Sequence, residues 1–251
     1  MQEFVDFTKE LATASGDIIN SYFRTGVNIE TKSDDSPVTI ADKKAEEAMR
    51  EMIMKAYPEH GIIGEEFGNY NEDAEYQWVL DPIDGTKSFI TGTFLFGTLI
   101  GLMKNRQPIL GAIHHSVTSH LLIGTGDETR LNGDKITVRA NEKLRDAALL
   151  YTDFVDIGKY QNGIAFQQLM GRTRINRTWG DCHGYFLVAT GYADIMLDPI
   201  MNLWDIVALI PVIEGAGGKI TDWKGNPPLD GHGIIATNGD LHEQVLRALN
   251  P

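Results

Sequence analysis

The sequence is poor in cysteine, in positive charge and in long hydrophobic runs, and each shortage excludes a class of protein. Among its 251 residues Cys182 is the only cysteine, so no disulfide can form within the chain and a reducing compartment is expected. No stretch approaches the roughly 18 uninterrupted apolar residues that span a membrane. The opening residues, MQEFVDFTKELA, lack the basic start and apolar centre of a secretory signal. We therefore expect a cytoplasmic protein with no membrane partner.

Basic residues are outnumbered by acidic ones. The sequence has 22 Lys and Arg against 35 Asp and Glu, a formal net charge of −13 at pH 7. Nucleic acids are bound mainly by neutralising their phosphates with Lys and Arg, so no nucleic-acid partner is expected. A small phosphorylated substrate would need a local source of positive charge to overcome the field of the whole protein.

Hydrophobic periodicity predicts a layered α/β protein. Apolar residues recur at helical spacing over residues 2–24, and Thr39 is predicted to open a second helix. Residues 28–38 are polar and predict a loop. From residue 77 to about 123, short apolar runs broken by Gly, Pro and Asn predict a meander of antiparallel strands. Strand-like and helix-like segments alternate after that, including one helix over LWDIVALIPVIEGAG.

The change of pattern near residue 140 predicts two halves. The N-terminal half, residues 1–140, is expected to be α+β and to carry the metal-binding residues described below. The C-terminal half, residues 141–251, is expected to be α/β. Because no flexible linker or low-complexity stretch separates them, we expect the halves to pack tightly as one unit.

The segment WVLDPIDGTKSFITG, residues 78–92, sets two carboxylates at the end of an apolar strand. At short distance Asp81 and Asp84 would repel, and one would bind a proton unless a cation lay between them. Oxygen ligands suit hard cations such as Mg²⁺. Gly85 allows a close backbone approach, and the amides of Gly85 and Thr86 would form an anion site if they open a short helix. A metal site beside a phosphate site would supply the missing positive charge.

Further acids stand at the ends of other elements, and each has a purely structural alternative. Glu65 and Glu66 follow a strand-like run and could form a solvated acidic loop. Asp205 opens an apolar helix and could complement its dipole. Asp42 could form a capping box with Thr39. The pair in the DPID motif could likewise cap a turn.

Taken together, GEE, WVLDPIDGTKSF and the distal LWDIVALIPVIEGAGGKITDWKG resemble the inositol-monophosphatase-like family of metal-dependent, lithium-sensitive phosphatases. The resemblance extends over nearly the whole chain. It implies a five-layer α-β-α-β-α sandwich of the inositol monophosphatase or fructose-1,6-bisphosphatase type, often assembled as a homodimer. It also implies hydrolysis of small phosphomonoesters with two or three Mg²⁺ ions per active site, two of which activate water and stabilise the leaving group.

The resemblance assigns the metal ligands by their positions in these motifs. It implies that Glu65, Asp81 and the carbonyl of Ile83 hold the first ion. Asp81, Asp84 and Asp205 would hold the second, with Asp81 bridging. Glu65 would also help to hold a third, looser ion, and it therefore counts among the catalytic residues.

The resemblance also assigns the groups around the attacking water and the phosphate. Thr86 matches the threonine that hydrogen-bonds the water, and Asp42 matches the acid behind it. The amides of Gly85 and Thr86 match the phosphate site. Family members use the region of residues 26–37 as a metal-responsive flap, from which Lys32 would reach the site.

The leaving group is indicated by two further motifs. DGTKSF and WGDCHGYFLVATGYADIML resemble the histidinol-phosphate phosphatase branch, although members that act on nucleotide bisphosphates have a similar DGTKEF and His183 stands where an aromatic residue is usual. Asp198 lies six residues before Trp204, where the inositol enzymes have an acid that touches the substrate. Asp198 and Asp181 would suit the cationic L-histidinol group by charge complementarity, with Asp205 beside them. Both Asp181 and Asp198 could instead start turns.

We therefore predict a Mg²⁺-dependent histidinol-phosphatase, which converts L-histidinol phosphate and water to L-histidinol and phosphate in L-histidine biosynthesis. The enzyme alternatives are an inositol-1-monophosphatase and a broad-specificity small-molecule phosphatase. The alternative outside catalysis is a silent protein that binds metal and phosphate.

The seven histidines show no zinc-ligand spacing. His114 and His115 are adjacent on a predicted strand, so their side chains are expected on opposite faces. His183 is the one histidine expected near the substrate pocket, and Cys182 is expected to be a small buried hydrophobe.

Overall fold

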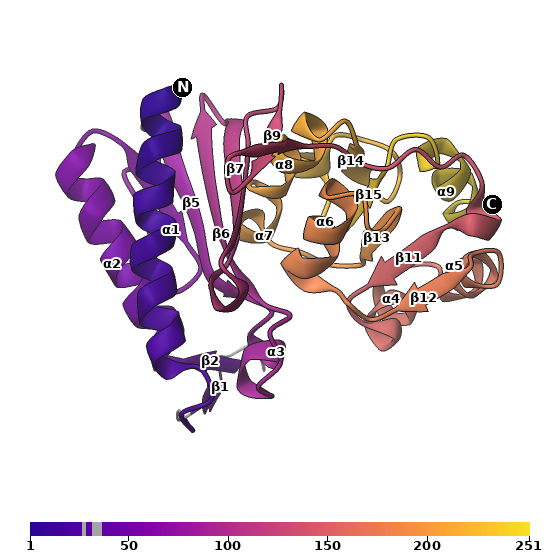
Figure 1. The fold of residues 1–251 in the computed structure, drawn as a ribbon, viewed down its shortest axis with the longest axis horizontal. Helices are drawn as coiled ribbons and strands as arrows, with labels where there is room; N and C mark the ends of the chain where they lie inside the picture. The colour runs from indigo at the N-terminus through magenta and orange to yellow at the C-terminus, as the bar shows by residue number, and fades with distance from the viewer. Residues whose placement is uncertain (27–28, 32–36) are drawn as a thin grey trace.

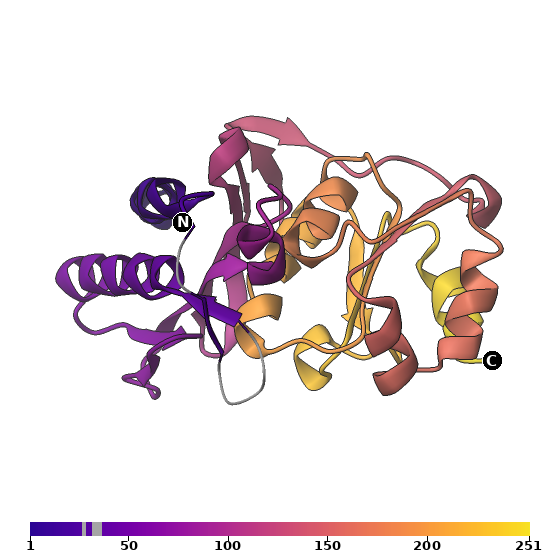
Figure 2. The ribbon, with the colours of Figure 1, turned by 90° about the horizontal axis from the view of Figure 1, so that it is seen from below.

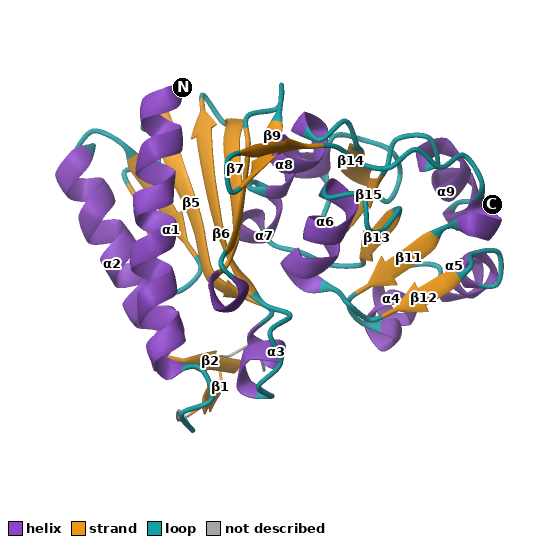
Figure 3. Cartoon of the chain, in the orientation of Figure 1, coloured by secondary structure: helices purple, strands orange, loops and turns teal. Residues whose placement is uncertain are grey.

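The chain folds into five alternating layers of helices and strands, as Figures 1 and 3 show. The structure is a computed structural model that describes residues 1–26, 29–31 and 37–251. The layers run from the first two helices at one end to the last helix and its neighbours at the other, and the view from below shows the same order (Figure 2). The expected α-β-α-β-α sandwich is confirmed. Within the described residues, none of the helices combines the length and the apolar character that a membrane crossing requires.

The first layer is a pair of long helices that cover the outer face of the larger sheet. They are α1 (Gln2–Tyr22) and α2 (Ile40–Ala56). The Thr39 side chain accepts a hydrogen bond from Ala41 N at 3.1 Å, and the Asp42 carboxylate accepts one from Thr39 N at 2.9 Å. This capping box fixes where α2 begins, as its sequence predicts. Leu11 and Trp78 are both fully buried between these helices and the sheet.

The second layer is an eight-stranded sheet. Its strands are β3 (Gly61–Gly64), β4 (Gly68–Tyr70), β5 (Tyr76–Asp84), β6 (Gly97–Lys104), β7 (Gln107–His115), β8 (His120–Gly124), β9 (Thr129–Leu131) and β10 (Asp134–Ile136). They lie in the order β10-β9-β8-β7-β6-β5-β3-β4. The antiparallel meander expected over residues 77 to about 123 is confirmed for β5 to β8 and continues into β9 and β10, whereas β3 runs parallel to β5.

The middle layer contains α6 (Asp181–Ala189), α7 (Leu203–Ile206) and α8 (Leu209–Gly215). The single helix expected over LWDIVALIPVIEGAG is therefore wrong. The backbone keeps helical angles at Val207 and Ala208, but Pro211 has no N–H to donate to the carbonyl four residues earlier, so the helix is interrupted. A side chain at Gly111 of β7 would overlap the Ala208 backbone, so glycine allows α8 to approach the sheet closely.

The fourth and fifth layers complete the C-terminal half. The second sheet contains β11 (Ala148–Tyr151), β12 (Ile175–Arg177), β13 (Ile195–Asp198), β14 (Lys219–Asp222) and β15 (Ile234–Thr237), in the order β12-β11-β13-β15-β14. Its outer face is covered by α4 (Phe154–Tyr160), α5 (Gly163–Met170) and α9 (His242–Leu249). Short 3-10 helices occupy Ser116–Thr118, Leu144–Asp146 and Pro228–Asp230.

The connection between the halves is anchored by the buried Asp194. Its carboxylate accepts hydrogen bonds from Ala148 N at 2.6 Å and from Asn141 Nδ2 at 3.1 Å, and it forms an ion pair with Arg139. The last strand of the larger sheet ends at Ile136, and the first strand of the second sheet begins at Ala148. The division into functional halves near residue 140 stays a prediction.

A two-stranded ribbon replaces part of the loop expected over residues 28–38. It pairs β1 (Ile29–Thr31) with β2 (Pro37–Thr39) in antiparallel register. The β-branched residues of these two short segments favour extended backbone, which the polar composition of the region obscures. Lys32, expected to reach the active site, lies outside the described residues.

Candidate metal centre

The end of β5 is irregular, and this irregularity brings two carboxylates together. The pairing of β5 with β6 shifts register between Asp81 and Asp84. The buried Thr98 hydroxyl donates to the Pro82 carbonyl at 2.8 Å and holds the bulge in place. A regular strand would turn residues three apart to opposite faces, so the bulge is what allows Asp81 and Asp84 to converge.

A third carboxylate reaches the same point from the middle layer. Asp205 lies in the first turn of α7 and accepts a hydrogen bond from Asn202 N at 2.7 Å. One carboxylate oxygen from each of Asp81, Asp84 and Asp205 lies within 4.8 Å of the other two. Asp205 therefore lies in the first turn, where its charge can complement the helix dipole, and it also caps α7; the same side chain joins the cluster.

Three carboxylates this close repel one another. Removal from water, together with the charges of Glu65, Asp84 and Asp205, raises the pKa of Asp81 well above its usual value. Removal from water, and then the neighbouring aspartates, raises the pKa of Asp84 in the same way. Removal from water raises the pKa of Asp205 to about 7, with the charge of Glu65 contributing.

The cluster fits a hard cation. Asp81 is 2% exposed, and its Oδ1 atom is buried without a hydrogen-bond partner. A buried charge without compensation is costly, and a divalent cation would both neutralise the cluster and give this oxygen a partner. The donors are all carboxylate oxygens, which Mg²⁺ and similar hard ions prefer.

Glu65 approaches the cluster from β3. Its N–H donates to the Leu80 carbonyl at 3.2 Å and so extends the parallel pairing of β3 with β5 by one residue. Its charge raises the pKa of both Asp81 and Asp205, which places its carboxylate beside theirs. The expected ligands Glu65, Asp81, Asp84 and Asp205 therefore lie together, although their action as metal ligands stays a prediction.

The residues expected around the water, Thr86 and Asp42, do not form the expected pair. The Thr86 hydroxyl donates to the Ile83 carbonyl at 3.1 Å, whereas the Asp42 carboxylate accepts from the Thr39 hydroxyl at 2.6 Å. Burial raises the pKa of Asp42 to about 6, and its second oxygen is buried without a partner. No hydrogen bond joins Thr86 to Asp42 within the described part of the chain, so their cooperation stays a prediction.

The short helix expected after the DPID motif is confirmed as α3 (Thr86–Ile90). Gly85 precedes it with a φ of 86°, a left-handed conformation that favours glycine. A side chain at Gly85 would also come within 3.1 Å of the Asp181 carboxylate. The Ser88 N–H already donates to the Gly85 carbonyl at 2.8 Å, so the first-turn N–H groups without an acceptor inside the helix are those of Thr86 and Lys87, which are available to an anion.

The two acids expected near the leaving group lie beside the cluster. Asp181 begins α6, and its N–H donates to the Thr152 hydroxyl at 2.9 Å. Burial raises its pKa to about 7, the charge of Asp198 adds to the effect, and Lys87 opposes it. Burial likewise raises the pKa of Asp198 to about 6, and its Oδ2 atom is buried without a partner. Both acids act on the pKa of Asp84, so all of them share one site.

One contact of the site has no clear signal in the sequence. Cys182 is fully buried, as expected, but its backbone N–H also donates to the Asp84 carboxylate. Its thiol lies 3.8 Å from the Asp84 carbonyl. A backbone donor from α6 carries no residue-type signature, so only the three-dimensional fold could reveal it.

Three histidines pack against aromatic rings or other chain segments, and the expected position of His183 near the substrate pocket stays a prediction. His114 and His115 point to opposite faces of β7, as expected: His114 lies against Gly16 of α1, whereas the ring of His115 lies 2.6 Å from the Phe96 carbonyl. His183 packs edge-on against His115, with ring centroids 5.1 Å apart. Its ring is therefore occupied by aromatic packing.

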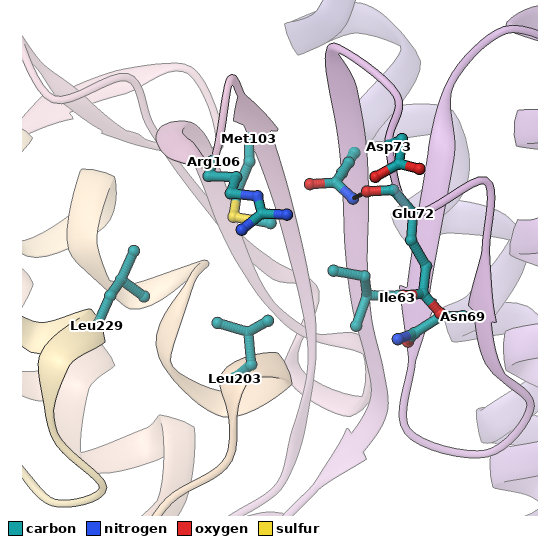
Figure 4. Close-up of a pocket in the computed structure, with 9 residues that line it drawn as sticks. Ile63, Asn69, Glu72, Asp73, Met103, Arg106, Leu203 and Leu229 are labelled. Atoms are coloured by element: carbon teal, nitrogen blue, oxygen red, sulfur yellow. Dashed lines mark hydrogen bonds between the residues drawn. The ribbon is translucent and has the colours of Figure 1, made fainter.

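A cavity of about 270 Å³ lies elsewhere, between the larger sheet and the C-terminal half. Figure 4 shows Arg106 on one side of it, Glu72 and Asp73 opposite, and Leu203 and Leu229 on a third side. None of the clustered carboxylates lines this cavity, so it is not the metal centre.

Comparison with known proteins agrees with this geometry. The inositol monophosphatase family model matches residues 1–251. The bifunctional phosphatase IMPL2, chloroplastic, of Arabidopsis thaliana is 41% identical over 262 residues, which cover 99% of this chain and 75% of that protein. A histidinol-phosphatase of Chlorobaculum parvum is 34% identical over 243 residues, which cover 96% of this chain and 94% of that one.

The fold is also found among solved structures. An inositol monophosphatase from Zymomonas mobilis superposes with a TM-score of 0.88 at 35% identity, covering 100% of this chain and 98% of that one. Family model, relatives and fold agree with the clustered oxygen ligands of a metal-dependent phosphatase. The chain belongs to the inositol monophosphatase family.

Proposed function

We propose that this phosphatase is a Mg²⁺-dependent histidinol-phosphatase, which hydrolyses L-histidinol phosphate to L-histidinol and phosphate. The observation that carries the proposal is the pair of acids, Asp181 and Asp198, beside the clustered carboxylates. An acidic pocket suits a leaving group that carries an ammonium and an imidazole. The histidinol-phosphatase of Chlorobaculum parvum supports the same assignment.

The ligands divide between two ions. Glu65, Asp81 and the Ile83 carbonyl would hold one, and Asp81, Asp84 and Asp205 would hold the other. A third, looser ion would lie at Glu65. When bound, Mg²⁺ would supply the activation of water and the neutralisation of charge on the phosphate.

The protein's own groups would orient the reactants. The Thr86 hydroxyl would turn from the Ile83 carbonyl to hold the water, and the unpartnered oxygen of Asp42 would support it. The first N–H groups of α3 would hold the phosphate beside Gly85. Because the acids that repel one another would then face cations, positioning and charge neutralisation would supply most of the rate enhancement.

The leaving-group pocket would recognise the positive charge of the substrate. Asp198 keeps one oxygen without a partner, and Asp181 lies close to Gly85 at the start of α3. The L-histidinol ammonium would supply the missing partner. A neutral polyol would offer only hydroxyl groups, which gain less from a buried carboxylate than a cation does.

A substrate panel tests the proposal. Phosphate release with Mg²⁺ is measured from L-histidinol phosphate, inositol 1-phosphate and adenosine 3′,5′-bisphosphate. We expect kcat/KM for L-histidinol phosphate to exceed the others by about a hundredfold, equivalent to about 2.7 kcal/mol in the transition state. Comparable rates on all three would contradict the assignment and favour a broad-specificity phosphatase.

The similarity to the Zymomonas mobilis inositol monophosphatase supports a second candidate function, that of an inositol-1-monophosphatase. A preference for inositol 1-phosphate in the same panel would establish it. A silent protein that binds metal and phosphate would release no phosphate from any of the esters. A homodimer, a cytoplasmic location and a place in L-histidine biosynthesis belong to the proposal as well.

A further inference from the structure

Helix α2 carries a second buried acid, which is not among the site residues expected from the sequence. Glu46 lies one turn after Asp42 on the same face of the helix, and its side chain is fully buried. Asp42 faces the residue that caps the helix, whereas Glu46 faces the loop that follows β3 and contains Glu65. Burial raises the pKa of Glu46, and contacts with backbone N–H groups oppose that effect.

The Glu46 carboxylate binds the two peptide groups that directly follow Glu65. Glu46 Oε2 accepts from Glu66 N at 2.8 Å, and Oε1 accepts from Phe67 N at 3.2 Å. Hydrogen bonds from N–H groups to an ionised carboxylate are stronger than neutral ones. The backbone immediately after Glu65 is therefore held by both oxygens of one side chain.

Arg50 closes the other end of the same loop. Its Nη1 atom lies 3.2 Å from Glu46 Oε1 and donates to the Gly68 carbonyl at 2.8 Å. Gly68 has a φ of 67°, so the chain turns sharply there. Glu46 and Arg50, one helical turn apart, thus clamp the loop at both ends.

The strand before the loop is shaped to admit this clamp. A side chain at Gly64 would overlap the Glu46 carboxylate and come within 3.0 Å of Arg50 Nη1. On the other side of Gly64, the Glu65 N–H is bound to the Leu80 carbonyl. The backbone of Glu65 is therefore fixed before and after its Cα atom, and this sets the direction in which its side chain leaves.

We propose that Glu46, supported by Arg50, is a positioning residue that holds the Glu65 carboxylate in place for a metal ion. The inference rests on the proposed Mg²⁺ site. Outer groups that orient a ligand typically change metal affinity 10- to 100-fold when they are removed. Glu46 lies behind the backbone of Glu65 and acts only through it, so its loss weakens metal binding more than it changes turnover at saturating metal.

The test compares E46Q with E47Q, a matched control because Glu47 is the exposed neighbour of Glu46 on the same helix. Glutamine keeps the shape of the side chain, but its single oxygen cannot accept from both N–H groups and it has no charge for Arg50. Mg²⁺ binding to the metal-free proteins is measured by calorimetry without substrate, together with phosphate release over a range of Mg²⁺ concentrations.

We expect E46Q to raise the Kd for Mg²⁺ about tenfold or more, with kcat at saturating Mg²⁺ within about threefold of the unmodified protein. E47Q should match the unmodified protein in both. If E46Q lowers thermal stability but leaves the Kd unchanged, the residue is merely structural and the inference is overturned.

A second variant keeps the question answerable if E46Q does not fold. R50Q leaves Glu46 and its two N–H contacts in place but removes the anchor to Gly68, so it should raise the Kd measurably but by less than E46Q does. An unchanged Kd in R50Q would then overturn the inference. If the unmodified protein and E47Q themselves bind no Mg²⁺, the proposed metal site fails as well, which separates the two failures.

Discussion

Replacing Asp205 by asparagine should stabilise the metal-free protein while it removes activity. Asp205 repels Glu65 and Asp198 and shares a hydrogen bond with Asp81. The amide of D205N keeps an oxygen for the Asn202 N–H, which the carboxylate binds at 2.7 Å, so the cap of α7 survives. What D205N loses is a charge that repels its neighbours in the metal-free protein and would be needed only to bind a cation.

The size of the effect follows from the pKa of Asp205. Its usual value is 3.8, and burial raises it to about 7 in the folded protein without metal. Between these values the folded chain binds more protons than the unfolded chain, so the unfolding free energy falls as the pH rises from about 4 to about 7 and levels off above that. A shift of about three units corresponds to about 4 kcal/mol. Because the carboxylate is partly exposed and coupled to Asp81, we expect about half of this, roughly 2 kcal/mol.

The assay is urea unfolding with a chelator at pH 5 and pH 8. At pH 8 D205N should be more stable than the unmodified protein by about 2 kcal/mol, and at pH 5 the difference should be less than half of this, since Asp205 is then protonated in the folded chain and ionised only in the unfolded chain. D127N, at an exposed acid outside the cluster, should show no such dependence. Equal responses to pH in D205N and the unmodified protein would refute the view that the cluster stores repulsion. Retained phosphatase activity in D205N would refute its role as a ligand.

Two further predictions concern the leaving-group pocket and the middle layer. D198N keeps the shape of the side chain but removes its charge, so kcat/KM for L-histidinol phosphate should fall about tenfold. The kcat/KM for p-nitrophenyl phosphate should change little, because its leaving group carries no positive charge. Equal losses on both esters would contradict charge recognition. G111A would drive a methyl group into the Ala208 backbone and should lower the unfolding free energy by about 1–3 kcal/mol in urea. G158A, where nothing lies within 4 Å, is the control, and equal stability of the two variants would contradict close packing of α8 on β7.

The sequence predicts most of the site because its acids stand at the ends of apolar segments. Asp81 ends an apolar strand and Asp205 opens an apolar helix, and both patterns are visible without coordinates. Glu46 has no such position in the sequence pattern, because an acid in the middle of an amphipathic helix is ordinarily predicted to be exposed to solvent. Its burial depends on the turn after Glu65, which β3 brings against α2, and that contact exists only in the folded chain.

Two details of the structure were missed for different reasons, one local and one tertiary. The apolar run of α7 and α8 has the periodicity of one helix, and only the missing N–H of Pro211 divides it. The N–H of Cys182 could not be predicted either, because every residue except proline offers one. It reaches Asp84 because α6 points its first turn at the end of β5, an arrangement that depends on how the two sheets face each other.

The origin of the acids explains how so acidic a protein can bind a phosphate. Asp81 and Asp84 come from the larger sheet, Asp181 and Asp205 from the middle layer, and Asp198 from the second sheet. Folding therefore concentrates negative charge at the junction of the layers, where removal from water raises the pKa of every one of these acids and repulsion adds to this for all of them except Asp198. On the proposed function, cations bound by these acids would relieve the repulsion. They would also supply the local positive charge that a phosphate needs in a protein with a net charge of −13.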